Sequence, residues 1–111
     1  MIGVRNACAL ARNFGDAGID VVLTDVLTPA SANLYRQLLP DCFIVRFVVA
    51  FHEAERRAAS RTMFLTRDEF ANLHRTDRSM PPRADRELMA DYLSPEELVR
   101  VVDELWKSAS E

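Results

Sequence analysis

The sequence predicts an α/β fold: a small parallel sheet covered by helices on both faces, in three layers, α/β/α. Three short apolar runs, at 20–27, 42–50 and 87–92, are typical of buried strands. Segments with apolar residues at helical spacing separate them, and this alternation favours parallel strands. The length of 111 residues and the apolar fraction of 49% fit a single domain, residues 1–111.

Residues 2–15 form the first predicted helix. Their apolar side chains recur at helical spacing, at Val4, Ala7, Cys8, Ala11 and Phe14. Gly15 and Gly18 then supply a helix stop and a turn. Residues 20–27, DVVLTDVL, are rich in β-branched and apolar side chains, so they predict a first strand that is buried in the sheet.

A short helix and a second strand follow. Thr28 is a suitable N-cap and Pro29 suits the first helical position, so a helix is expected from about 30 to 39. Residues 42–50, CFIVRFVVA, form the second predicted strand. Arg46 is its single charged residue, and we expect it at a sheet edge or beside an acid such as Asp41.

Two helices are predicted in the arginine-rich centre of the chain. Residues 52–61, HEAERRAASR, form an alanine-rich polar helix. Thr66 with Glu69 three residues later is a capping box, which predicts a helix over 67–76.

The last part of the chain predicts loop, strand and helix. Residues 77–86 form the loop and 87–92 a weaker third strand. Ser94, Pro95 and Glu97 together give a cap, a first-turn proline and a capping-box acid. The helix that they begin carries an apolar face made of Leu98, Val101, Val102, Leu105 and Trp106.

Charge and cysteine content exclude several protein classes. A net charge of −3 argues against general nucleic-acid binding, and no apolar run approaches the ~20 residues that span a membrane. Cys8 and Cys42 are isolated and no secretory signal is present, so we expect a cytoplasmic protein with free thiols. His52 and His74 lack neighbouring ligands, so no metal site is predicted.

Three stretches of the chain, in order, resemble one known family. They are NACALARNFGDAGIDVVLTDVL, RFVVAFHEAERRAASR and LSPEELVRVVDEL. Together they resemble the P-loop small-molecule kinases, in particular the chloramphenicol-phosphotransferase-like, gluconate-kinase-like and related AAA-type ATP-binding proteins. The resemblance covers Asn6 to Leu105. It implies ATP and Mg²⁺ as cofactors and a small hydroxylated molecule as the phosphate acceptor.

The phosphate-binding loop of that family has no counterpart in this sequence. The loop is GxxxxGK[ST], in which backbone N–H groups and a lysine hold the phosphates. The glycines here are at 3, 15 and 18, and none of them precedes a lysine. We therefore expect an incomplete P-loop core: either the C-terminal part of a longer kinase, or a relic that has lost its nucleotide cradle.

The missing segment has a structural consequence. In the family, the strand before the phosphate loop lies between the strands that match 20–27 and 42–50. Unpaired apolar strand edges are unfavourable. We expect either that the strands 20–27 and 42–50 pair directly in a rearranged sheet, or that a homodimer forms in which the partner fills the central position.

Asp25 is the first candidate catalytic residue. It stands at the carboxyl end of a predicted parallel strand, where open α/β sheets bind ligands. The resemblance implies a role at the magnesium shell or as acceptor of a proton from the substrate hydroxyl. Relatives commonly carry an acidic pair there, whereas this chain has Thr24 and Asp25. The alternative is an acid that caps the helix beginning at Thr28 and Pro29.

The resemblance places the family's mobile lid between the second strand's helix and the next helix. Residues 51–86 hold eight arginines against six acids, and the arginine fork suits phosphate. Arg61 and Arg67 are candidates to stabilise the transferring phosphate, with Arg57 as a nucleotide contact. The alternative is a solvated helix face in which Glu53 pairs with Arg57 and its neighbour.

The resemblance implies four further contacts. Tyr92 and Ser94 match the loop that packs on adenine, and Arg5 and Asn6 begin the helix that faces the acceptor pocket. The sequence thus suggests an NTP-dependent phosphotransferase-like protein that is inactive alone. The alternatives are a non-catalytic α/β binding or dimerisation module derived from such a kinase, and a regulatory α/β domain whose likeness to the kinases is coincidental.

Overall fold

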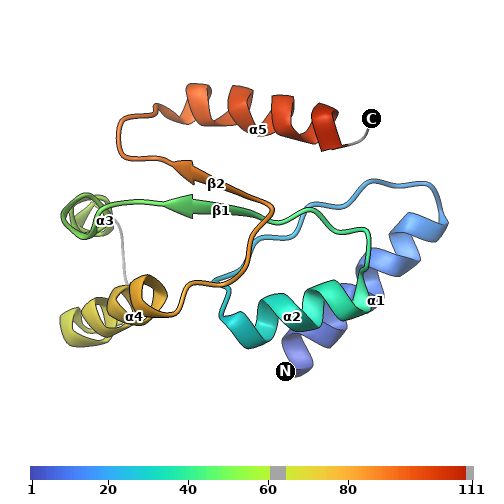
Figure 1. The fold of residues 1–111 in the computed structure, drawn as a ribbon, viewed down its shortest axis with the longest axis horizontal. Helices are drawn as coiled ribbons and strands as arrows, with labels where there is room; N and C mark the ends of the chain where they lie inside the picture. Colours follow the sequence, from blue (N-terminus) through green and yellow to red (C-terminus); the bar gives the residue numbers. More distant parts are fainter. Residues whose placement is uncertain (61–64, 110–111) are drawn as a thin grey trace. The chain divides into compact units, whose positions relative to one another are not determined.

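The computed structural model describes residues 1–60 and 65–109. Figure 1 shows helices and a two-stranded parallel sheet in this part of the chain. The elements are α1 (Ile2–Asp16), α2 (Pro29–Leu38), β1 (Val45–Val48), α3 (Phe51–Ala59), α4 (Arg67–Ser79), β2 (Arg86–Met89) and α5 (Pro95–Ala109). The mixture of helices with parallel strands confirms a small α/β fold. None of the described helices is long and apolar enough to cross a membrane.

The chain divides into two compact units, residues 1–42 with 75–83, and residues 43–74 with 84–111. The first contains α1 and α2. The second contains both strands, α3, α5 and the first part of α4.

A glycine ends α1. Gly18 has a φ of 77°, a left-handed conformation that other residues rarely adopt. The N–H of Ile19 donates to the carbonyl of Phe14 at 2.9 Å, and that of Gly18 to the carbonyl of Gly15 at 3.0 Å. This pair of bonds is the Schellman ending of a helix, so Gly18 is the residue that carries the predicted stop.

The core of the first unit lies between α1 and α2. Its buried residues are Val4, Cys8 and Tyr35, and around them pack Ala7, Leu27, Leu34, Leu38, Leu39 and Cys42. Arg12 adds a polar contact: its Nε and Nη2 donate to the carbonyl of Leu38 at 3.0 and 2.6 Å. A cation thereby satisfies a carbonyl in the last turn of α2, where the helix dipole favours positive charge.

The predicted strand over 20–27 is wrong. These residues have no strand structure, and their Val22 and Val26 side chains are 75% and 68% exposed. The backbone N–H groups of residues 20–25 form no backbone hydrogen bond within the described residues. A strand exists only where a neighbour accepts its ladder of hydrogen bonds, and β-branched composition does not supply that neighbour.

The other two predicted strands form, and they pair directly. β1 and β2 run parallel, with Val45 opposite Arg86 and Val48 opposite Met89. Both are shorter than the apolar runs at 42–50 and 87–92. The Arg46 guanidinium meets Glu87 across the pair at 3.1 Å, which confirms that the one charged residue of its run lies beside an acid.

Carboxylates bind the backbone at both ends of this short sheet. Before β1, the N–H of Ile44 donates to Oδ2 of Asp85 at 2.7 Å. After β1, the N–H of Ala50 donates to Oδ1 of Asp91 at 2.8 Å. Two aspartates that flank β2 thus extend the contact between the strand segments beyond the four paired residues of each strand.

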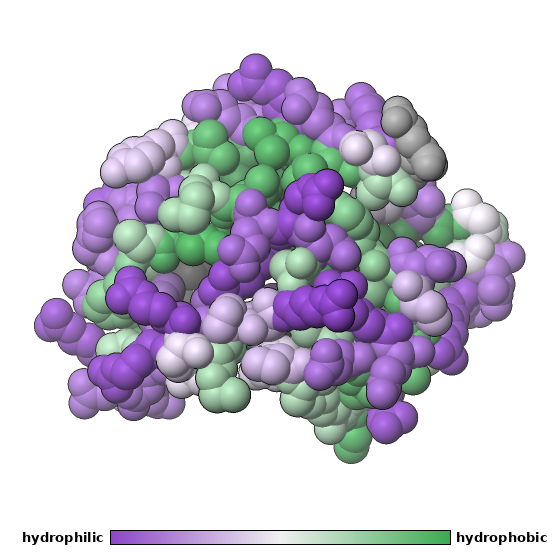
Figure 2. Space-filling model, viewed as in Figure 1, coloured by the Kyte–Doolittle hydropathy of each residue, from purple (hydrophilic) through white to green (hydrophobic). Residues whose placement is uncertain are grey.

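The predicted helices form close to their expected bounds. Thr66 and Glu69 make the capping box before α4, because each backbone N–H donates to the other side chain at 3.1 Å. Ser94 caps α5 by accepting the N–H of Glu97 at 3.1 Å. The α5 helix lies beside the strand pair in Figure 1, and Figure 2 shows hydrophobic residues gathered beneath its hydrophilic outer side.

Asp85 should contribute measurably to stability. The substitution Asp85→Ala leaves the N–H of buried Ile44 without its carboxylate, which should lower the free energy of unfolding by about 1–3 kcal/mol. Urea unfolding followed by circular dichroism measures the change. The control, Asp103→Ala, removes an exposed pair with Lys107 and should cost less than about 1 kcal/mol. Equal losses in the two variants would contradict the assigned role.

Candidate functional site

Asp25 is bound by its own chain through both carboxylate oxygens. Oδ1 accepts the N–H of Val26 at 2.7 Å, and Oδ2 accepts the hydroxyl of Tyr35 at 2.9 Å. Burial of Tyr35, followed by its hydrogen bond to Asp25 and the charge of that carboxylate, raises the pKa of the Tyr35 hydroxyl to about 12. Tyr35 therefore stays protonated and donates to Asp25 at neutral pH.

The sequence alternative, in which Asp25 caps the next helix, is wrong. Thr28 caps α2 by accepting the N–H of Ser31 at 3.1 Å, while Ser31 Oγ accepts the N–H of Thr28 at 2.8 Å. Asp25 instead fixes the end of the 20–27 segment against the second turn of α2, through Tyr35. It is exposed, so ligand access to the carboxylate is retained.

Arg57 belongs to a polar network on α3. Its Nε contacts Glu53 at 3.0 Å, and its Nη2 donates to the carbonyls of Ala90 and Asp91 at 2.8 and 3.4 Å. Arg56 pairs with the same carboxylate at 2.6 Å. The i,i+3 and i,i+4 pairs named as the alternative are therefore present, and Arg57 also holds α3 to the chain that follows β2.

Of the two candidate lid arginines, Arg67 lies in the described part of the chain and Arg61 does not. Arg67 begins α4, and its side chain is 85% exposed with a loose contact of 3.6 Å to Glu55. A long cation in that state remains available to a phosphate. Arg61 lies outside the described residues, so its role stays a prediction.

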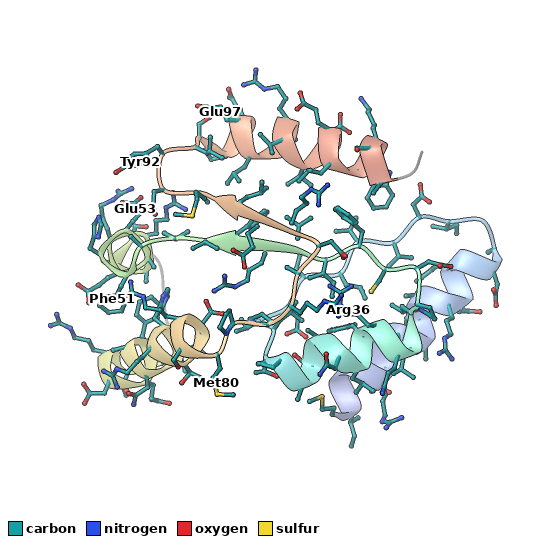
Figure 3. The ribbon with its side chains drawn as sticks, in the orientation of Figure 1. Arg36, Phe51, Glu53, Met80, Tyr92 and Glu97 are labelled. Atoms are coloured by element: carbon teal, nitrogen blue, oxygen red, sulfur yellow. The ribbon has the colours of Figure 1, made fainter. Side chains whose placement is uncertain are left out.

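The carboxyl ends of β1 and β2 form the clearest candidate site in the second unit. At this end β1 leads into α3 through Ala50, and β2 leads to the start of α5 through 90–94. Open α/β sheets bind ligands at this end of their strands. Figure 3 shows Glu53, Tyr92 and Glu97 at the same end of the pair.

Tyr92 and Ser94 lie in this connection. The Tyr92 side chain is 96% exposed, so its ring is open to a flat ligand. Ser94 is occupied as the cap of α5. Arg57 reaches the main chain directly before Tyr92, so these three predicted cofactor contacts lie in one part of the second unit.

Arg5 and Asn6 lie in the first turns of α1, outside its buried face. Both are exposed, whereas Val4 and Cys8 on the other side of the helix are buried. They belong to the first unit with Asp25. Their position on an exposed helix surface leaves substrate binding as a prediction.

Sequence reasoning missed Asp91 as an organiser of the site, and it named Glu53 only as a partner in surface ion pairs. Asp91 holds Ala50 immediately before α3, and Glu53 holds both arginines of α3. The signal for Asp91 was the same one that singled out Asp25: an acid at the carboxyl end of an apolar run. In the described part of the chain, no three His, Cys, Asp or Glu residues are grouped so that they could hold a metal ion.

Glu53 should make stability depend on acid pH. Hydrogen bonds from Arg56 and then Arg57 lower the pKa of Glu53 to about 2, below the 4.5 of a free glutamate. The stabilisation is fully present above pH ~5 and is lost as the pH falls towards ~2, because the folded state holds the proton less tightly than the unfolded state.

The midpoint temperature of thermal unfolding should therefore fall less between those two pH values in the Glu53→Gln variant than in the unchanged chain. Thermal scans at each pH measure it. The double variant Arg56→Gln with Arg57→Gln should reduce this fall in the same way, since it removes the partners instead of the acid. An unchanged slope in both variants would show that this pair does not control acid stability.

No family model, curated protein or solved structure matches this chain.

Proposed function

We propose that the chain is a P-loop phosphotransferase-like protein of the small-molecule kinase type, which does not transfer phosphate by itself. The observation that carries the proposal is the carboxyl end of the β1–β2 pair, where Arg57 is fixed by Glu53 beside the exposed Tyr92. Parallel strands that lead into helix N-termini at one end offer a site suited to an anionic ligand.

The residues divide into three roles under this proposal. Tyr92 stacks on the base of ATP, with Ser94 and Arg57 shaping the connection around it. Arg67 and Arg61 provide positive charge to the transferring phosphate. Asp25 orients the acceptor hydroxyl or the magnesium shell, and Arg5 with Asn6 contacts the acceptor molecule.

The chain lacks the group that would hold the triphosphate. Its only lysine, Lys107, lies in the last turn of α5 and pairs with Asp103 at 2.9 Å. No glycine-rich loop accompanies it. Without backbone N–H groups and a lysine converging on the phosphates, tight binding of Mg-ATP is not expected.

The second candidate function is a non-catalytic α/β binding or dimerisation module derived from such a kinase. It is favoured by the engagement of the candidate side chains in the fold. Both oxygens of Asp25 accept bonds from Val26 and Tyr35, and Arg57 binds main-chain carbonyls. Their contacts within the fold are enough to explain why these residues are present, and no substrate is needed to explain them.

Mg-ATP titration tests the expected inactivity. Isothermal calorimetry should detect no Mg-ATP binding with a dissociation constant below about 1 mM for this chain, and no ATP hydrolysis should be measurable. A dissociation constant in the micromolar range would overturn the expectation that the missing phosphate-binding loop prevents tight binding of Mg-ATP.

A second experiment separates the two functions. The chain is expressed together with the residues that its gene encodes before Met1, if those include GxxxxGK[ST]. A kinase should then phosphorylate small hydroxylated molecules, and Arg67→Ala should lower kcat by about 10³-fold or more. The control, Arg100→Ala on α5, should leave kcat unchanged. Absence of the upstream loop, or nucleotide binding without phosphate transfer, would favour the non-catalytic module.

A further inference from the structure

Both cysteines of the chain belong to the core of the first unit. Cys8 lies on the buried face of α1, with an exposed fraction of 1%. Cys42 packs against the same core cluster from the chain that follows α2. The two are not joined by a disulfide in this structure. A small core thus gathers two thiols that stand far apart in the sequence.

Both cysteines border Tyr35. The Tyr35 side chain is buried in one cluster with Cys8, and the Sγ of Cys42 donates to the main-chain carbonyl of Tyr35 at 3.9 Å. A tight turn brings Cys42 to this position. The N–H of Leu39 donates to the carbonyl of Tyr35 at 2.8 Å, and the N–H of Cys42 donates to the carbonyl of Leu39 at 3.0 Å. The chain therefore folds back over the end of α2 at Cys42.

The α1 helix is held against the same end of α2. Arg12, one turn after Cys8 on α1, donates through its Nε and Nη2 to the carbonyl of Leu38 at 3.0 and 2.6 Å. Leu38 is the last residue of α2, four residues before Cys42. The two cysteines are thus carried by segments whose contact is already fixed by packing and by hydrogen bonds.

The two thiols differ in accessibility, which sets the order in which they react. Burial raises the pKa of the Cys8 thiol, and the nearby charge of Arg12 offsets only part of this effect. Because the thiolate is the reactive form, and because Cys8 is closed to solvent, Cys8 is a poor target for an oxidant. Cys42 is half-buried, so an oxidant reaches it first.

We propose that Cys8 and Cys42 form a reversible disulfide, which makes the first unit a redox-sensitive element with a low-molecular-mass disulfide such as oxidised glutathione as the oxidant. The Cys42 thiolate attacks one sulfur of the oxidant, so that the S–S bond of the oxidant breaks, a mixed disulfide forms and one thiolate leaves. The Cys8 thiolate then attacks the Cys42 sulfur and releases the second thiolate. The two protein thiols are oxidised, the oxidant is reduced to two thiols, and these take up the two protons.

The link would close a loop that contains the 20–27 segment and Tyr35. Tyr35 holds Asp25 through its hydroxyl, so oxidation would restrict the segment that carries this carboxylate. A cross-link of this kind stabilises a fold by reducing the freedom of the opened chain. The proposal rests on the first unit alone and holds whether or not the chain takes part in phosphate transfer.

Reaction of the folded, reduced chain with oxidised glutathione tests the link. The intact mass should fall by about 2 Da, since two hydrogens are lost, and proteolysis without reductant should yield the Cys8 and Cys42 peptides joined. Dithiothreitol should restore the reduced mass. A mixed disulfide that persists at Cys42 would overturn the proposal, because Cys8 then does not reach it. A disulfide between two chains, or no reaction, would overturn it as well.

Single substitutions separate the two steps. Cys8→Ala should stop the reaction at the mixed disulfide on Cys42. Cys42→Ser, which changes the more accessible residue, should leave the buried Cys8 unmodified under the same treatment. Rapid modification of Cys8 in the Cys42→Ser variant would overturn the assigned order of the steps.

Hydrogen exchange measures what the link does to the fold. Oxidation should slow the exchange of α1 amides by about 30- to 1,000-fold, because the closed loop makes opening of the first unit less favourable. Amides of α5, in the second unit, should change less and serve as an internal control. In Cys42→Ser, the same treatment should leave the exchange of α1 unchanged. Equal exchange of α1 in the oxidised and reduced chains would show that the link does not restrict the unit.

Discussion

The second unit depends on the clamping of a very short parallel sheet by charged side chains. Four residues in each strand give few ladder hydrogen bonds, and isolated two-stranded sheets are marginal in water. Asp85 and Asp91 bind the backbone of Ile44 and Ala50 at the two ends of β1. Arg57 then ties α3 to the chain after β2. Buried or half-buried donors satisfied in this way define the register of the pair.

The same contacts position the candidate site. Asp91 fixes the start of α3, and Arg57 fixes the connection that displays Tyr92. The exposed residues of the site therefore stand on a frame held by hydrogen bonds within the fold. Arg67 differs, because its side chain is 85% exposed and its contact with Glu55, at 3.6 Å, is loose.

The first unit shows what happens where such partners are lacking. Residues 20–27 have stronger strand composition than 87–92, yet only the latter forms a strand. The difference is that Arg86 to Met89 find β1 beside them, while the backbone of 20–25 finds no acceptor in the described residues. Asp25 and Tyr35 hold one end of this segment, and Leu27 packs on the core.

The sequence by itself determined the elements whose causes are local. Helix starts at Thr28, Thr66 and Ser94 were predicted because a capping side chain and the backbone N–H that donates to it lie within three residues of each other. Tertiary structure alone decided which apolar runs became strands and what Asp25 and Arg57 contact. Those outcomes depend on groups far along the chain, and no periodicity or spacing records which distant backbone will accept a hydrogen bond.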